Sequence, residues 1–319
     1  MMSRQLGRSG LAVSEIGLGT AQIGGSSLIG GRYVGAPKIE RIDAVRILEK
    51  AFDMGINFFD SADKYGDGES ERLLGEVFHG RRGQVILATK CGITASGDRC
   101  FSRDYVRACV EKSLKNMKTD HIDVFQLTKP SIGLIKSGDI YETLDELKKE
   151  GKIRFSGIST GSDEETLRLI DDNRVDALQI FYNLLHISPN ELIIGKAFEA
   201  GIGLIIRSPL SSGLLTGKFN FDTKFSQEDD RGGFLYGKLL ASRIDMINKI
   251  KEHFSLTVDY SIMELSLNYL LSNSKISTII PGASKVDHLS GILKLCEIER
   301  IKPRLFREIE VFVKENYKE

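Results

Sequence analysis

Three side chains of complementary chemistry occur in the first third of the sequence. Asp60 and Tyr65 share one short segment, and Lys90 ends the next apolar one. An ammonium beside a phenol stabilises the phenolate and lowers the pKa of the phenol. Such a phenol can give a proton to a carbonyl oxygen near neutral pH, as a general acid does in carbonyl reduction. The residues alone also fit a simpler interpretation, in which Asp60 and Lys90 form a buried ion pair and Tyr65 is a loop aromatic.

The elements that must position these residues are eight short apolar segments. Each is a nearly continuous apolar run, which is typical of parallel strands buried on both faces. Asp60 and Lys90 end the second and third segments, so neighbouring strands would bring them together. The predicted strands are Ile16–Ala21, Asn57–Ser61, Val85–Cys91, Ile122–Thr128, Arg154–Ser159, Ala177–Tyr182, Gly203–Arg207 and Ser277–Pro281.

Stretches of helical period separate the strands. Five helices are predicted, over residues 39–54, 102–117, 162–170, 259–271 and 301–317. Alternating strands and helices predict a parallel sheet. Eight strands, and no G-x-G-x-x-G after any of them, favour a closed (β/α)8 TIM barrel over an open doubly wound sheet. We therefore expect one domain over residues 1–319, with an N-terminal hairpin, Arg4–Val13, that closes the lower end of the barrel, and a C-terminal helix.

The composition excludes several classes of protein. The chain has 319 residues, with 44 Lys plus Arg balanced by 44 Asp plus Glu. A net charge of zero argues against nucleic acid or an anionic membrane as the main partner. The four cysteines have no C-x-x-C spacing, so we expect free thiols and no metal site. The N-terminus lacks a signal-peptide pattern and no apolar run approaches the roughly 20 residues of a membrane span, so we expect a cytoplasmic protein.

Chemistry in such a barrel lies at the carboxyl ends of the strands. Two long loops are candidate lids over that end: Gly24–Lys38, which has five glycines, and the polar loop Lys218–Gly237. Cys91, which follows Lys90, is expected to point away and pack. Tyr182 is expected to pack as well, although its position at a strand end leaves a substrate contact open.

Six segments resemble the aldo-keto reductase superfamily in sequence and order. The likeness extends from about residue 4 to residue 295. It implies a barrel that binds a nicotinamide cofactor without a Rossmann fold, and catalysis by an Asp, a Tyr, a Lys and a His. The matching segments are Leu6–Thr20, Gly55–Gly75, Asp120–Leu127, Gly151–Ser159, Ser208–Lys218 and Ile280–Lys285.

The resemblance assigns catalytic roles to Asp60, Tyr65 and Lys90. It also implies that Ser284 and Lys285 hold the adenosine 2′-phosphate, which favours NADPH over NADH, although many members have Arg where this chain has His288. NADH remains possible on this pattern. The implied cofactor-binding residues are Gly19, Thr20, Ser159, Gln179, Arg207, Ser208, Leu210, Ser212, Gly213, Lys218, Gly282, Ser284, Lys285 and His288.

The fourth catalytic position departs from the family. The family places His where this chain has Thr128, so we expect Thr128 to line the carbonyl pocket. Losing one preorganised donor to a developing oxyanion costs roughly 100- to 1,000-fold in rate. Three outcomes stay open: reduction of a carbonyl compound whose own groups complete the site, a related hydride transfer such as C=C reduction or alcohol oxidation, and a slow cofactor-sensing protein. An aldolase with Lys90 as the Schiff-base nucleophile is a fourth.

Two basic residues bear on the substrate. Lys129, beside Thr128, and Arg32, in the first candidate lid, could meet a phosphate or carboxylate, although ordinary surface charge is the simpler interpretation of both. The expected partner is a small carbonyl compound. The sequence does not predict an oligomeric state.

Overall fold

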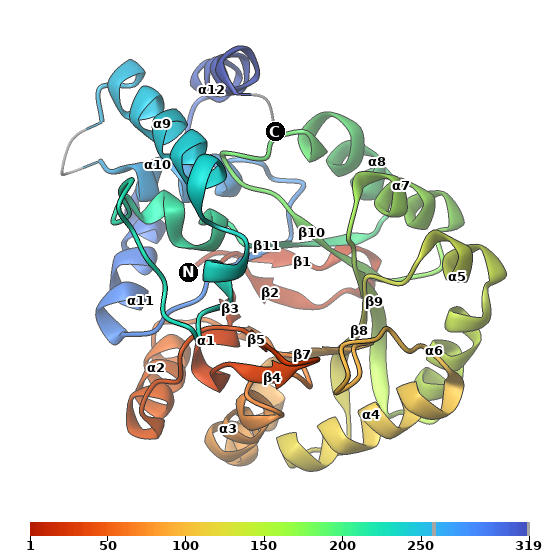
Figure 1. The fold of residues 1–319 in the computed structure, drawn as a ribbon. Helices are drawn as coiled ribbons and strands as arrows, with labels where there is room; N and C mark the ends of the chain where they lie inside the picture. The colour runs from red at the N-terminus through yellow and green to blue at the C-terminus, as the bar shows by residue number, and fades with distance from the viewer. Residues whose placement is uncertain (257–259, 318–319) are drawn as a thin grey trace.

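The computed structural model describes residues 1–256 and 260–317. Eight parallel strands form one sheet, and the bridges Ile16–Ile279 and Gly19–Gly282 join its first strand to its last. The sheet is therefore closed into a barrel with helices around it, as predicted (Figure 1). The strands are β3 (Leu18–Gly19), β6 (Phe58–Asp60), β7 (Ile86–Cys91), β8 (Ile122–Thr128), β9 (Ile153–Ser159), β10 (Ala177–Phe181), β11 (Gly203–Arg207) and β12 (Thr278–Ile280).

The helices pack outside the barrel. The predicted helix over residues 259–271 begins at Ile262, because Ser261 and Glu264 form a capping box there, while Asp259 lies outside the described residues. The predicted C-terminal helix begins at Pro303, a favoured first residue. The longer helices are α2 (Arg41–Asp53), α3 (Glu69–Phe78), α4 (Arg103–Met117), α6 (Asp139–Lys149), α7 (Asp163–Asp172), α9 (Gly237–His253), α10 (Ile262–Leu271), α11 (Val286–Leu293) and α12 (Pro303–Asn316). The shorter ones are α1 (Ala21–Gly24), α5 (Ile132–Ser137) and α8 (Gly195–Glu199).

An N-terminal hairpin closes the lower end of the barrel, as predicted. Its strands are β1 (Ser3–Gln5) and β2 (Ala12–Ser14). Leu6 and Val13 are fully buried in one cluster with side chains from the barrel strands. Gly7 has a φ of +51°, and a Cβ there would lie 2.3 Å from the backbone nitrogen of Gly203. Only glycine lets the hairpin approach β11 this closely.

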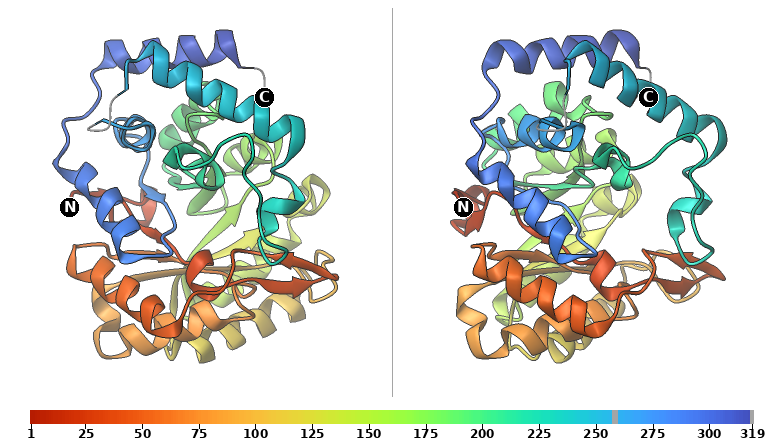
Figure 2. Two further views of the ribbon diagram at one scale, coloured as in Figure 1. Left: turned by 60° about the vertical axis from the view of Figure 1, so that its left-hand side comes forward. Right: turned by 90° about the vertical axis from the view of Figure 1, so that its left-hand side faces the viewer.

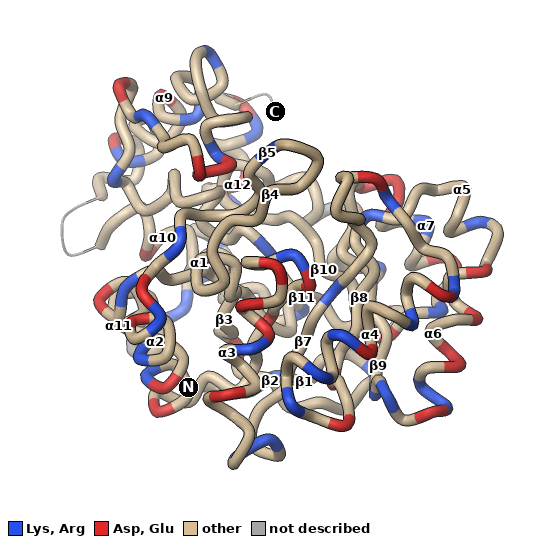
Figure 3. Tube along the Cα trace, turned by 60° about the horizontal axis from the view of Figure 1, so that its bottom comes forward, with Lys and Arg blue, Asp and Glu red and all other residues tan. Residues whose placement is uncertain are grey.

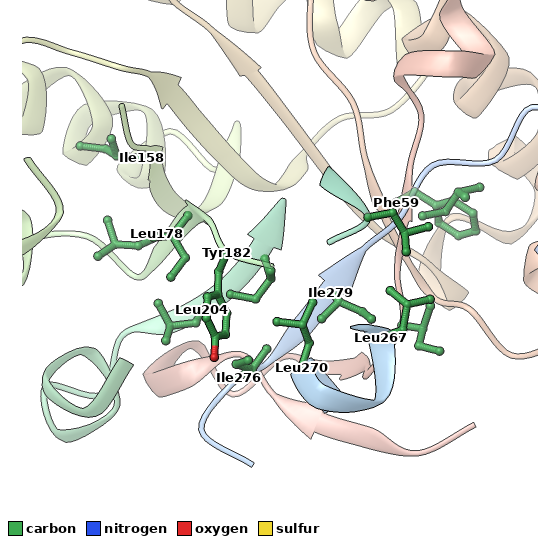
Figure 4. Packing of buried hydrophobic residues seen from close by; sticks show 14 of the residues in the cluster. Phe59, Ile158, Leu178, Tyr182, Leu204, Leu267, Leu270, Ile276 and Ile279 are labelled. Carbon is green, nitrogen blue, oxygen red and sulfur yellow. The ribbon is translucent and has the colours of Figure 1, made fainter. Parts of the chain in front are cut away.

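A second apolar layer lies between the strands and the helices. Figure 4 shows part of it, with Leu204, Tyr182 and Ile279 near Leu270 of α10. Tyr182 is fully buried and its hydroxyl donates to the hydroxyl of Tyr269 at 2.7 Å, so its predicted packing role is confirmed. Cys91 is buried too, and its contact with Cys109 and its burial raise the pKa of its thiol well above the usual value.

The two candidate lids, Gly24–Lys38 and Lys218–Gly237, meet above the upper end of the barrel. The first, predicted as a loop, contains a hairpin of β4 (Ser27–Ile29) and β5 (Arg32–Val34), because Gly30 and Gly31 form a two-residue turn at positive φ. In both views of Figure 2 the segment after β11 comes down to this hairpin. The Gly35 nitrogen donates to the Asp230 carboxylate at 2.9 Å, and the Asp230 nitrogen donates to the Gly35 oxygen at 3.1 Å.

Charge is distributed evenly over the outside. Basic and acidic residues alternate along the outer helices, whereas the β4–β5 hairpin carries Arg32 as its one charged residue (Figure 3). Over residues 1–256 and 260–317, no helix has the length and apolar character needed to span a bilayer.

Candidate active site

A cavity of about 850 Å³ opens at the carboxyl ends of the strands. The strands place polar side chains there because β6 and β7 are paired in register, with Asp60 opposite Ala88. Lys90 lies two residues beyond Ala88 and therefore on the same face. The cavity brings together Asp60, Tyr65, Lys90 and Thr128 at one end, beneath the lids.

The Asp60–Lys90 ion pair is buried. The Lys90 ammonium donates to the Asp60 carboxylate at 2.5 Å and to the Ser61 carbonyl at 2.7 Å. The other Asp60 oxygen accepts from the side-chain amides of Gln126 at 2.9 Å and Gln179 at 2.8 Å. Burial acts to lower the pKa of Lys90, but the charge of Asp60 and its hydrogen bond, together with Tyr65, outweigh burial and raise that pKa. Lys90 is therefore a charged ammonium at neutral pH.

Tyr65 lies directly against this ammonium. The Lys90 nitrogen is 5.1 Å from the centre of the Tyr65 ring. The turn that carries Tyr65 packs tightly on α1, since a Cβ at Gly66, whose φ is +61°, would lie 1.9 Å from the Gly24 oxygen. Glycine at this position lets the turn hold the phenol over Lys90.

Donors of another kind converge at the opposite end of the cavity. The Lys218 ammonium lies 3.1 Å from one nitrogen of His288, and the Ser284 hydroxyl lies 3.3 Å from the other. Burial, and then the charges of Lys218 and Lys285, lower the pKa of His288. The loop after β11 adds residues at positive φ, among them Ser212, a conformation in which successive backbone N–H groups can line an anion-binding concavity. This donor set fits phosphate groups.

Most of the residues implied by the resemblance line this one cavity. Two do not. Thr20 is fully buried and donates to the Asp60 backbone oxygen at 2.9 Å, and Lys285 directly precedes α11 without a capping hydrogen bond from its side chain. The lining set is Gly19, Asp60, Tyr65, Lys90, Thr128, Ser159, Gln179, Arg207, Ser208, Leu210, Ser212, Gly213, Lys218, Gly282, Ser284 and His288.

Sequence reasoning missed two glutamines. Gln126 binds Asp60 from the interior of β8, where a polar residue within an apolar run was the available signal. Gln22 lines the cavity and lies over Gly282, where a Cβ would come within 2.0 Å of its side-chain oxygen. That oxygen is buried and has no hydrogen-bond partner among the described residues, so it is available to a ligand.

The two basic residues that the sequence offers as substrate contacts differ in place. Lys129 lines the cavity, whereas Arg32 lies exposed on β5 and is not part of the cavity wall. Another histidine could replace the one that the family has at position 128 only from within the cavity. His186 does not line the cavity, and its ring packs on Phe181 with centroids 5.0 Å apart. His121 lies beyond the other end of β8 and contacts Asp120.

Asp63, in the turn before Tyr65, is buried without a close hydrogen-bonding cation. Burial raises its pKa to about 6, against the opposing charge of Lys64 at 3.7 Å. The folded state therefore favours protonated Asp63. The free energy of unfolding that Asp63 contributes is highest below about pH 4, is lost as the pH rises from about 4 through about 6, and stays low above that.

Asp63→Asn should therefore stabilise the protein at pH 8 and have little effect at about pH 3, below the ordinary pKa of an Asp side chain. A two-unit shift corresponds to about 2–3 kcal/mol. Chemical unfolding of the variant at both pH values measures the difference. Asp67→Asn is the matched control, because the Asp67 side chain is 78% exposed in the same loop. Equal effects of Asp63→Asn at the two pH values would contradict the assignment.

Comparisons with known proteins agree with one another. A profile of the Aldo/keto reductase family matches residues 15–314. The chain is 30% identical to an uncharacterized oxidoreductase, YqkF, of Bacillus subtilis, over 99% of this chain and 98% of that protein. It is 29% identical to an L-glyceraldehyde 3-phosphate reductase of Escherichia coli O157:H7, over 91% and 86% of the two chains.

Comparison with solved structures gives the same family. The holo form of aldo-keto reductase AKR11C1 from Bacillus halodurans superimposes with a TM-score of 0.80 at 27% identity, covering 98% of this chain and 96% of that one. The profile spans nearly the whole sequence, the relatives align end to end, and the barrel is shared. The chain therefore belongs to the aldo/keto reductase family of oxidoreductases.

Proposed function

We propose that this protein is an NADP(H)-dependent reductase of aldehydes, ketones or sugar-type carbonyl compounds, with Tyr65 as the general acid. The observation that carries the proposal is the Lys90 ammonium, held by Asp60 and lying 5.1 Å from the Tyr65 ring centre at one end of the cavity. A phenol beside a cation can give its proton to a carbonyl oxygen, because the cation stabilises the phenolate that remains. The E. coli relative, named as a reductase of an aldehyde, supports this direction of reaction.

The cavity is suited to a nicotinamide cofactor along its length. Lys218, Ser284 and His288, with the backbone of the loop after β11, would hold its phosphates. Ser159 and Gln179, which share a hydrogen bond of 3.2 Å, would meet the carboxamide near the catalytic end. The buried Nε of Arg207 has no partner among the described residues and would face the ring. When bound, the reduced cofactor supplies a hydride to the carbonyl carbon.

The side chains of this chain manage the proton. Tyr65 donates its hydroxyl proton to the carbonyl oxygen as negative charge develops there. Lys90 stays protonated and stabilises the phenolate that remains. Asp60 keeps Lys90 in place, and the amides of Gln126 and Gln179 hold the second Asp60 oxygen so that the carboxylate cannot turn away. The two lids cover the cavity and limit access of water to the reacting atoms.

A Schiff-base aldolase is less well supported. Its nucleophile is a neutral amine, and the Lys90 ammonium is instead held by two acceptors with its pKa raised. The free thiols of the four described cysteines fit a reducing compartment, and we propose the cytoplasm as the location.

Thr128 lines the cavity, and its side chain limits the rate of carbonyl reduction because it replaces the histidine of the family. Its hydroxyl is shorter than an imidazole and gives one neutral hydrogen bond. Thr128→His should raise kcat/KM for simple aldehydes by at least about 10-fold, since a positioned donor to an oxyanion is worth roughly 100- to 1,000-fold. The measurement is NADPH oxidation, followed by its ultraviolet absorbance, with a panel of aldehydes, ketones and sugars, alongside NADH.

Thr128→Val is the matched control, because it keeps the shape and removes the hydroxyl. It should lower the rate on those same substrates. Bound NADPH with no oxidation by any carbonyl compound, in the wild type and in Thr128→His alike, would overturn the proposed reductase.

A further inference from the structure

Lys129 is held rigidly at the carboxyl end of β8. Its backbone nitrogen donates to the Ser159 oxygen at 2.7 Å, and its own oxygen accepts from the Arg99 guanidinium at 2.8 Å. Its φ is +51°, in the left-handed region that residues other than glycine rarely adopt. This conformation redirects the chain immediately after Thr128, and both residues line the catalytic end of the cavity.

The Lys129 side chain is half-buried against Gly161. A Cβ at Gly161 would lie 3.4 Å from the Lys129 side-chain carbons. The acid that acts electrostatically on Lys129 is Glu165, and its carboxylate accepts from the Gly161 nitrogen at 2.8 Å. Within residues 1–256 and 260–317, no carboxylate lies within ion-pairing distance of the Lys129 ammonium, which also makes no hydrogen bond there.

The surroundings of Lys129 are positively charged. Burial lowers its pKa, and the charges of Arg207 and Arg99 lower it further, against the weaker opposite influence of Glu165. Arg207 is itself partly buried, with its Nε unpartnered among the described residues, and it interacts electrostatically with Tyr65. Asp60, the buried acid in the cavity wall beside Tyr65, is already held by Lys90 and two amides.

An unpaired ammonium held in such a place is unfavourable unless a ligand supplies the opposite charge. The wall beside Thr128 carries two cations, Lys129 and Arg207, that no described carboxylate neutralises. Both line the space that a substrate must enter to reach Tyr65. Lys129 would meet a substrate group on the side of the carbonyl away from Lys218 and His288, where the other donors cluster.

We propose that Lys129 is a specificity residue that selects carbonyl substrates bearing an anionic group, a carboxylate or a phosphate, on the chain beyond the reacting carbon. The inference rests on the proposed reductase activity. Lys129 would form a charge-assisted hydrogen bond to that anion and fix the carbonyl against Tyr65. A substrate that is anchored in this way compensates for the absence of the family histidine at position 128, because orientation no longer depends on that side chain.

The test compares matched pairs of substrates with NADPH. One pair is 4-carboxybenzaldehyde and its neutral methyl ester, and the other is glycolaldehyde phosphate and glycolaldehyde. In the wild type we expect the anionic member of at least one pair to have the higher kcat/KM, and the pair that responds identifies carboxylate or phosphate as the preferred anion. Lys129→Met should lower kcat/KM for that anion by about 10- to 100-fold, mainly through KM, and change the neutral member by less than about threefold. Lys129→Arg keeps the charge and should restore most of the preference.

Arg32→Met is the matched control, because Arg32 lies exposed outside the cavity wall. It should leave the anionic preference unchanged. Turnover of all four compounds with no anionic preference, or a preference that survives in Lys129→Met, would overturn the assignment of Lys129 while the reductase activity stands. No turnover of either member of either pair, together with none across the aldehyde panel, would instead remove the proposed function itself.

Discussion

Tyr65→Phe should lower kcat at least about 1,000-fold, since a positioned general acid contributes up to roughly 10,000-fold. The substitution removes one hydroxyl and keeps the ring that contacts Lys90 at 5.1 Å. The cavity wall, the ion pair and the phosphate-binding donors are otherwise unchanged. Binding of NADPH, measured by the change in its own fluorescence or by calorimetry, should therefore stay within about threefold of the wild type, while single-turnover oxidation of NADPH becomes very slow.

The informative comparison for this prediction is Tyr236→Phe. Tyr236 lies in the second lid and is 65% exposed, so Tyr236→Phe removes the same hydroxyl at a position away from Lys90. It should retain full activity. Substantial turnover by Tyr65→Phe would mean that water or another side chain protonates the carbonyl oxygen, and the role of Tyr65 would have to be given up.

Lys90→Met should remove activity and also destabilise the fold by about 3–5 kcal/mol, because it leaves a buried carboxylate without its cation. Asp60 is 2% exposed, and after the substitution its charge is held by the amides of Gln126 and Gln179 alone. Urea unfolding at pH 7 measures the loss.

A double substitution separates the two effects of Lys90. Asp60→Asn with Lys90→Met removes both charges and keeps acceptor and donor groups for the glutamine amides, so it should recover most of the stability and none of the turnover. If the double variant is as unstable as Lys90→Met, packing of the lysine stem, not charge pairing, is what holds this end of the barrel. If Lys90→Met retains turnover, Lys90 has no part in proton transfer.

The outline of the site could be predicted from the sequence because the fold is regular. Continuous apolar runs located the strand bounds to within two residues, and in a parallel barrel the carboxyl ends of all strands lie at one end of the barrel. Asp60 and Lys90 end neighbouring strands, so their pairing followed from order along the chain alone. Thr128 was placed in the cavity by the same argument.

Other features depend on long-range contacts that no local pattern carries. Gln126 is a polar residue within an apolar run, but nothing in that run identifies Asp60 as its partner, because the contact forms only when β6 and β8 come together. The glycines of the first lid suggest a flexible loop, whereas Gly30 and Gly31 turn a hairpin that meets Asp230, far along the chain, through Gly35.

The sequence by itself determined the barrel, the place of Asp60, Tyr65 and Lys90 at its upper end, and the departure at Thr128, because these depend on strand order and residue type. Lys129 and Arg32 were equally plausible substrate contacts in the sequence. Only the tertiary structure shows that Lys129 lines the cavity and that Arg32 does not. Burial and charge balance are properties of the assembled wall. One lysine faces the cavity among cations with no described acid to neutralise it, and one arginine remains in solvent, because the chain directions at β8 and β5 place them there.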